Sequence, residues 1–88
     1  MSFLHSREYI NEGDVVEVMC SHQCNILLLT DTNFQNYKNN RRYSYSNGGF
    51  YKMFPARMQV PNTGYWNIVL FLAGGSARIK HTIKIIKK

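Results

Sequence analysis

Two runs of alternating side chains meet at a glycine pair in residues 65–84, YWNIVLFLAGGSARIKHTIK. Two-residue hairpin loops favour glycine, so a turn at Gly74 and Gly75 predicts an antiparallel hairpin. One face of this hairpin would carry apolar cross-strand pairs, namely Leu72–Ala77, Leu70–Ile79, Ile68–His81 and Trp66–Ile83. The other face would carry Tyr65, Val69 and Phe71 beside Arg78, Lys80 and Lys84. Such a division into an inside and an outside is expected of a half-buried antiparallel sheet.

Two more hairpins are predicted earlier in the chain. A three-residue turn at 21–23 would place apolar pairs on one face, namely Cys20–Cys24, Val18–Ile26 and Val16–Leu28. The dipeptide Asn47-Gly48 is a preferred two-residue hairpin turn. This second turn would pair Tyr45 with Phe50 and Tyr43 with Lys52.

The remaining elements complete a predicted all-β fold. Residues 56–60 alternate as a strand between two prolines. Residues 32–38 form the one short helix, capped by Asp31 or Thr32. About six or seven short strands predict one domain over residues 1–88. Its architecture would be a small antiparallel β-sandwich or a partly open barrel.

Composition indicates a globular domain, because 44% of the residues are hydrophobic and only 18% are charged. The first residues lack a basic segment followed by an apolar run, and no stretch reaches the ~20 apolar residues that cross a bilayer. Two cysteines are too few for a disulfide framework, which is typical of a reducing compartment. We therefore expect a cytoplasmic protein of bacterial or phage type with no transmembrane segment. Its Lys87-Lys88 end is expected to fray.

Charge is distributed very unevenly along the chain. All five carboxylates lie in residues 1–31, where a single arginine leaves a net charge of −4. Residues 32–88 hold ten lysines and arginines and no acid, which gives +10. An unneutralised cationic surface attracts anions over roughly a Debye length of ~8–10 Å. The asymmetry predicts an anionic partner, unless the acidic segment covers the basic one within a molecule or in a neighbouring copy.

Catalytic chemistry is not indicated by the residues. The Gly-x-Ser-x-Gly motif is absent, and every carboxylate that could orient a histidine base lies in the acidic segment. In the predicted register His81 faces the core. The glycine pairs Gly48-Gly49 and Gly74-Gly75 are each followed by a predicted strand, which is typical of turns rather than of phosphate-binding loops. We expect a protein that is not an enzyme and has no cofactor. The alternative of an enzyme that uses His5, His22 or His81 stays open behind the two binding functions described below.

The spacing Cys20-Ser21-His22-Gln23-Cys24 admits three interpretations. A zinc site needs four ligands, and the chain lacks a second pair of this kind. A strained cross-strand disulfide is the second interpretation. In the predicted register both cysteines face the core, which favours structural core thiols and no metal site.

Basic and aromatic side chains are interleaved on two of the predicted hairpins. Bases of single-stranded nucleic acid stack on such rings at ~1–3 kcal/mol each, while cations hold the backbone. The same rings could equally form core with the cations at its rim, and a solvated cationic face is an ordinary feature of a sheet. If these surfaces are functional, the partner-binding residues are Arg41, Arg42, Tyr43, Tyr45, Lys52, Tyr65, Phe71, Arg78, Lys80 and Lys84.

Several segments carry a family resemblance: Phe3 to Tyr9, Gly13 to Val16, Gln23 to Asn25, Asp31 to Tyr37, and Phe54-Pro55-Ala56 through Val60-Pro61 to Thr63-Gly64-Tyr65-Trp66-Asn67. Together they resemble the bacterial domain-of-unknown-function family eighteen eighty-three over nearly the whole chain. The resemblance implies a small sandwich-like domain, found alone or joined to a Toll/interleukin-receptor (TIR) domain. It brings no established activity and no catalytic residues. The TIR association implies a sensing or interaction module in bacterial defence or signalling, and the basic tail from Arg78 to Lys88 departs from the family.

We therefore expect a non-enzymatic binding module that presents a basic and aromatic sheet face to an acidic partner, in the first place a protein. That face would be the cationic face of the last predicted hairpin, with the hairpin of Tyr43 and Tyr45 contributing. The motivation is the excess of cations after Asp31. Single-stranded nucleic acid is the alternative ligand, and self-association into a homo-oligomer stays open.

Overall fold

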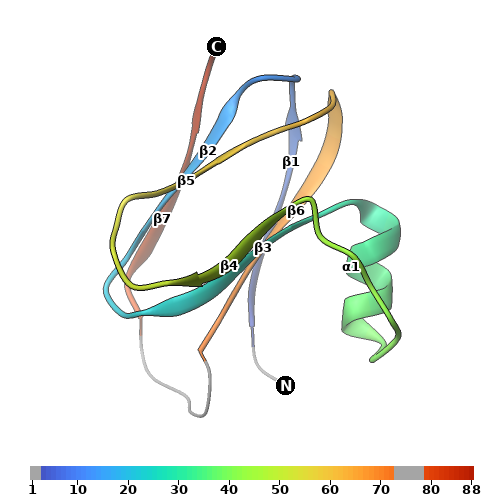
Figure 1. Cartoon of the computed structure of the whole chain (residues 1–88), viewed down its shortest axis with the longest axis horizontal. Helices are drawn as coiled ribbons and strands as arrows, with labels where there is room; N and C mark the ends of the chain where they lie inside the picture. Colours follow the sequence, from blue (N-terminus) through green and yellow to red (C-terminus); the bar gives the residue numbers. More distant parts are fainter. Residues whose placement is uncertain (1–2, 73–78) are drawn as a thin grey trace.

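The computed structural model describes residues 3–72 and 79–88, which form two layers of antiparallel sheet and one helix (Figure 1). In chain order the described elements are β1 (Leu4–Ile10), β2 (Val15–Cys20), β3 (Cys24–Leu29), α1 (Asp31–Lys38), β4 (Asn47–Tyr51), β5 (Ala56–Gln59), β6 (Gly64–Phe71) and β7 (His81–Ile86). The predicted all-β sandwich with one short helix is confirmed. None of the described residues belongs to a helix long and apolar enough to span a bilayer.

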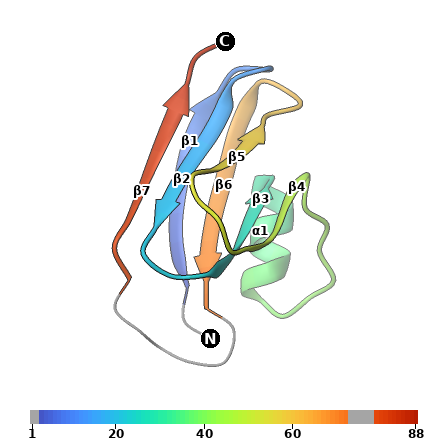
Figure 2. The same ribbon diagram turned by 60° about the vertical axis from the view of Figure 1, so that its left-hand side comes forward.

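The chain changes sheet at almost every step. One sheet has four strands in the order β1-β6-β3-β4, and the other has three in the order β5-β2-β7 (Figure 2). Among the described strands, β3 and β4 are the one consecutive pair that shares a sheet, and α1 lies between them in the chain. Every other connection passes from one layer of the sandwich to the other.

The three predicted hairpins are therefore wrong. β2 pairs with β5 and β7, whereas β3 pairs with β4 and β6. Asn47 and Gly48 form no turn, because they lie inside β4 opposite Leu28 and Leu27. β6 pairs with β1 and β3 and not with β7, and the predicted turn at 74–75 lies outside the described residues. The alternation of apolar and polar residues shows which side chains face inward, but not which strands pair. Two strands that face each other across a sandwich have the same alternation as two strands that are hydrogen-bonded in one sheet.

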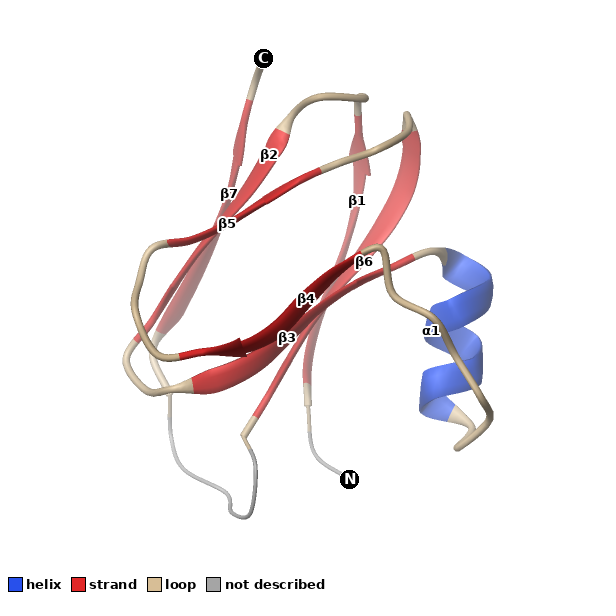
Figure 3. Ribbon diagram, in the orientation of Figure 1, coloured by secondary structure: helices blue, strands red, loops and turns tan. Residues whose placement is uncertain are grey.

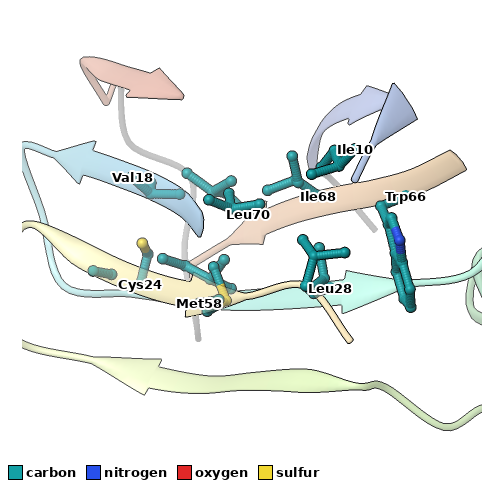
Figure 4. Close-up of a cluster of buried hydrophobic side chains, with 12 residues drawn as sticks. Ile10, Val18, Cys24, Leu28, Met58, Trp66, Ile68 and Leu70 are labelled. Carbon is teal, nitrogen blue, oxygen red and sulfur yellow. The ribbon is translucent and has the colours of Figure 1, made fainter. Parts of the chain in front are cut away.

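Most of the predicted inward residues of the hairpins around 21–23 and 74–75 do form the core between the sheets (Figure 4). Those that are fully buried are Val16, Val18, Cys24, Ile26, Leu28, Ile68 and Leu70. Trp66 lies with them, and its indole N–H donates to the carbonyl of Asn62 at 2.9 Å. Full burial of each aliphatic side chain contributes roughly 1.5–3 kcal/mol, so this cluster supplies most of the stabilisation that joins the layers.

A second apolar cluster lies between α1 and the outer face of the four-stranded sheet. Phe34 and Tyr37 of the helix pack against Leu27, Leu29 and Val69 of the sheet. Val69 is fully buried, so its predicted place on an exposed cationic face is wrong. The helix covers this part of the sheet.

Helix α1 begins one residue earlier than predicted and has a different cap. Thr30 is the N-cap, with extended backbone angles of φ −69° and ψ 166°, and its hydroxyl accepts from the Asn33 N–H at 3.3 Å. Thr is a favoured N-cap residue because its oxygen satisfies a backbone donor of the first turn. Asp31 instead occupies the first turn, where the helix dipole favours a negative charge.

Two predictions about the chain's last ten residues are also wrong. His81 is exposed at the start of β7, opposite Cys20 at the end of the sheet, because the core does not extend to this position. Lys87 and Lys88 do not fray: the Lys88 backbone N–H donates to Oδ1 of Asp14 at 2.9 Å, and the Lys87 ammonium lies 3.4 Å from Oδ2. Asp14 is only 3% exposed, so it anchors this segment.

Two neighbouring glycines test the packing of β4 against β3. Gly48 and Gly49 both have positive φ, +145° and +142°, which costs a side chain of order 1–3 kcal/mol of strain. A Cβ at Gly48 would collide with the Ile26 carbonyl oxygen and lie 3.1 Å from the Leu27 Cα, whereas a Cβ at Gly49 meets nothing within 4 Å. We expect Gly48→Ala to lower the free energy of unfolding by at least about 1 kcal/mol more than Gly49→Ala in urea titrations. Equal losses would contradict this close approach.

Candidate functional site

The ten residues predicted to bind a partner do not form one surface. Arg41, Arg42, Tyr43 and Tyr45 lie in the segment between α1 and β4, and Lys52 follows β4. Tyr65 and Phe71 lie at the two ends of β6 in the four-stranded sheet. Lys80 immediately precedes β7 and Lys84 lies within it, in the other layer. Arg78 lies outside the described residues.

The connection from α1 to β4, residues 39–46, runs back along the helix (Figure 3) and is here named the arm. Its backbone is fixed at three points. The N–H of Arg41 donates to Asn36 O at 2.8 Å, that of Ser44 to Asn33 Oδ1 at 3.0 Å, and that of Ser46 to Leu28 O at 3.0 Å. The arm is therefore held against α1 and β3 rather than free in solution.

The side chains of the arm divide into one inner ring and an outer basic group. Tyr43 packs edge-on against Tyr37 of the helix, with ring centroids 5.2 Å apart. Arg41, Arg42 and Tyr45 are exposed, and so is Lys38 at the end of the helix. The core interpretation thus holds for Tyr43, and the other arm residues face solvent.

Ion pairs consume most of the acid in the chain. Three of the five carboxylates are paired, Asp31 with Arg7, Glu17 with Arg57 and Asp14 with Lys87. Within residues 3–72 and 79–88, the cations without an ion pair are Lys38, Arg41, Arg42, Lys52, Lys80, Lys84 and Lys88. The first three are close in sequence at the end of α1 and the start of the arm.

The cations of β7 have an acidic neighbour, in contrast to the arm. Lys84 lies opposite Glu17 of β2, and Glu17 in turn lies opposite Arg57 of β5, whose guanidinium is 2.9 Å from it. The backbone N–H of Lys80 donates to the Ser21 hydroxyl at 2.9 Å. The outer face of the three-stranded sheet therefore carries charges of both signs.

Phe50, Asn25 and Phe71 form a row across three neighbouring strands at one end of the four-stranded sheet. Asn25 of β3 lies opposite both Phe50 of β4 and Phe71 of β6. Phe50 is 50% exposed, and the Lys52 ammonium is 6.0 Å from its ring centroid. Phe71 is partly buried and packs towards Tyr37. The row offers one exposed ring with a cation beside it.

A polar cluster that the sequence reasoning missed lies on the same sheet, beside the start of α1. Arg7 of β1 donates two hydrogen bonds to Asp31, at 3.0 and 2.8 Å. The amide nitrogen of Asn67, a residue only 1% exposed, donates to Asp31 Oδ1 at 2.8 Å and to Leu29 O at 3.3 Å. The amide oxygen of Asn67 can only accept, so Nε2 of His5 donates to it at 2.7 Å. The cluster ties β1, β6 and α1 together.

Aromatic rings flank this cluster on both sides. The guanidinium carbon of Arg7 lies 3.9 Å from the Tyr65 ring centroid, and Tyr9 meets Tyr65 edge-on at 5.2 Å. His5 stacks on Phe34 with centroids 3.9 Å apart and an interplanar angle of 11°. Tyr9 and Tyr65 stay 58% and 51% exposed. The cluster therefore presents a rigid arginine and two tyrosines to solvent.

Hydrogen bonding sets the charge state of the cluster. Hydrogen bonds from Arg7, and then from Asn67, lower the pKa of Asp31 to about 2 against the opposing effect of desolvation. The same hydrogen bonding, donated by Arg7 to Asp31, raises the pKa of Arg7. A carboxylate with so low a pKa is a poor general base near neutral pH. The arrangement suits holding and presenting side chains better than proton transfer.

Three segments of the family resemblance meet at this cluster: Phe3 to Tyr9, Asp31 to Tyr37, and Thr63 to Asn67. The presence of the cluster's residues in these three segments was the one indication of the cluster in the sequence. Without the pairing of β1 with β6, however, the spacing of His5, Arg7 and Asn67 in the sequence does not indicate that they touch.

The other histidines stand apart from this cluster. His22 is exposed at its loop, and its Nδ1 is 2.7 Å from the Ser21 hydroxyl. Across the described part of the chain, no three His, Cys, Asp or Glu side chains are placed to hold a metal ion together. Cys24 is fully buried in the core and Cys20 packs against it partly buried, both as free thiols.

Compared with known protein families, the chain matches the domain of unknown function DUF1883 over residues 1–88. No curated protein and no solved structure matches the chain.

The Arg7–Asp31 pair predicts an acid-dependent part of the stability. Because the folded-state pKa of Asp31 is lowered to about 2, its contribution is complete above the ordinary value of 3.8 and is lost as the pH falls towards 2. We expect Asp31→Asn to lower the free energy of unfolding near neutral pH by about 1 kcal/mol or less, since the pair is half exposed. The deficit should shrink between pH ~4 and ~2 in urea titrations. Glu12→Gln, which removes the same charge without an ion pair, is the control, and a deficit independent of pH would refute the assignment.

Proposed function

We propose, from the premise that this chain belongs to the DUF1883 family, that the domain is a non-enzymatic binding module that takes an acidic partner, in the first place a protein. The observation that carries the proposal is the unpaired group Lys38, Arg41 and Arg42 at the end of α1. The partner surface would therefore be the arm rather than the face predicted for the last hairpin, whose strands β6 and β7 lie in different sheets.

The chemistry of the arm supports an interface. Arginine and tyrosine are the side chains most enriched among residues that dominate binding energy, and the arm exposes Arg41, Arg42 and Tyr45. Its backbone is already fixed by hydrogen bonds to Asn33, Asn36 and Leu28. Less conformational entropy is lost on binding when a segment is ordered beforehand.

The ion pairs support the same assignment. Within the described residues, no carboxylate forms an ion pair with Lys38, Arg41 or Arg42. The carboxylate closest in sequence to the arm, Asp31, instead pairs with Arg7 and accepts from Asn67. Carboxylates of a partner would meet guanidinium groups that can form bidentate hydrogen bonds.

The cellular setting is part of the proposal. A role in bacterial defence or signalling rests on the family resemblance alone. A cytoplasmic location is supported by the cysteine count, since two cysteines are too few for the disulfide framework typical of small secreted domains.

Two double variants with the same change of charge test the site. Arg41→Glu/Arg42→Glu should abolish binding of a fluorescently labelled poly-glutamate peptide in anisotropy titrations at low salt, because it removes the unpaired cations of the arm. Lys80→Glu/Lys84→Glu, the matched control on β7, should retain most of the binding. Both should keep the circular-dichroism spectrum of the folded domain. Loss of binding in the β7 variant alone, or in neither variant, would refute the arm as the site.

Single-stranded nucleic acid is the second candidate ligand, favoured by the row of Phe50, Asn25 and Phe71 with Lys52 beside it. An exposed ring stacks on a base at ~1–3 kcal/mol. If this is the ligand, labelled oligothymidylate should bind with an affinity that falls steeply with salt, and Phe50→Ala should weaken it about fivefold or more. Met53→Ala, which removes a more exposed but non-aromatic side chain close by, should not. Absence of binding at low salt would eliminate this candidate.

A further inference from the structure

Cys20 and Cys24 lie on either side of the short connection between the two sheets. Cys20 ends β2 in the three-stranded sheet, and Cys24 begins β3 in the four-stranded sheet. Cys24 is fully buried in the core between the layers, and Cys20 is partly buried against that same core. The two thiols therefore approach each other from opposite layers.

Burial first, and then the neighbouring Cys20 thiol, raise the pKa of the Cys24 thiol to about 12. Thiolate, not thiol, is the nucleophile in disulfide exchange. Cys24 is therefore a poor nucleophile toward a disulfide that comes from outside the protein. Cys20 is more accessible and can attack such a disulfide.

We propose that Cys20 and Cys24 form a reversible dithiol–disulfide site that reacts with small-molecule disulfides, with Cys20 as the attacking thiol and Cys24 as the resolving thiol. The proposal goes beyond the partner-binding function and does not depend on it. It concerns the edge of the core, away from the arm.

The chemistry proceeds in two exchange steps. The Cys20 thiolate attacks glutathione disulfide, forming a Cys20–glutathione bond and releasing one glutathione thiolate, which takes up a proton. The Cys24 sulfur then attacks the Cys20 sulfur, and the proton that Cys24 gives up is taken by the departing glutathione thiolate, which leaves as a thiol. Two protein thiols are oxidised and one glutathione disulfide is reduced to two thiols. The new S–S bond, ~2.05 Å long, forms between two side chains that pack in the same apolar cluster and are separated by three residues in the chain.

Closing this bond would link the two sheets at one end of the sandwich. The loop between the cysteines is also tied to the chain before β7, because Ser21 N–H donates to Lys80 O at 2.8 Å and Lys80 N–H donates to the Ser21 hydroxyl at 2.9 Å. The disulfide would therefore restrain Lys80, immediately before β7, as well as the two sheets. Reduction by free glutathione reverses both steps.

Intact-mass spectrometry of the folded protein during incubation with glutathione disulfide tests the site. We expect the wild type to lose two hydrogen atoms with no glutathione retained, and Cys24→Ser to stop at one glutathione bound to Cys20. Folded Cys20→Ser should react ~10-fold or more slowly than Cys24→Ser, and should react readily once unfolded in urea. The urea control shows that burial, and not the substitution, protects Cys24.

Three results would overturn the site: a wild type that stays reduced, a wild type that accumulates the mixed disulfide, or a folded Cys20→Ser that reacts as fast as Cys24→Ser. If Cys24→Ser does not fold, peptide mapping of the wild type at early times replaces it. A transient glutathione adduct on Cys20 is then expected, and an adduct on Cys24 instead would refute the order of attack.

Discussion

Burial of the inward faces of the two sheets against each other holds the two layers of the domain together. Trp66, Ile68 and Leu70 of β6 lie in one cluster with Val16 and Val18 of β2. Because consecutive strands mostly belong to opposite layers, this packing also fixes where each connection runs. The outer face of the four-stranded sheet, its helix and the arm that returns from it are all positioned by that core.

The acidic residues near the start of the chain serve largely to hold this fold. Asp31 joins β1 and Asn67 to the helix, Glu17 joins β2 to β5 through Arg57, and Asp14 anchors the final lysines. Lys84 still lies opposite Glu17, whereas Lys38, Arg41 and Arg42 form no ion pair and are close together in the sequence, with the backbone N–H of Arg41 fixed by Asn36 O. Part of the uneven charge is thus neutralised in ion pairs within the fold, and the group Lys38, Arg41 and Arg42 is one part that is not.

Much of the fold could be predicted from the sequence, but the pairing of its strands could not. Alternation correctly placed Val18, Ile26 and Ile68 inside, because burial depends on which way a side chain points. It did not reveal that β2 and β3 face each other rather than pair, since both arrangements bury the same residues. The glycines at 48 and 49 resembled a turn, yet Gly48 is required by close contact with the Ile26 carbonyl. The His5–Asn67–Asp31 cluster was missed because it depends on the pairing of β1 with β6, a contact between residues far apart in the chain.

Binding of an acidic partner by the arm can be located residue by residue in nuclear magnetic resonance. The isotope-labelled protein is titrated with poly-glutamate peptide, and the chemical shifts of its backbone amides are followed. We predict that the largest shifts fall on residues 38–46, with small changes in β7. Shifts confined to β7, or no shifts at low salt, would show that the arm does not bind the peptide.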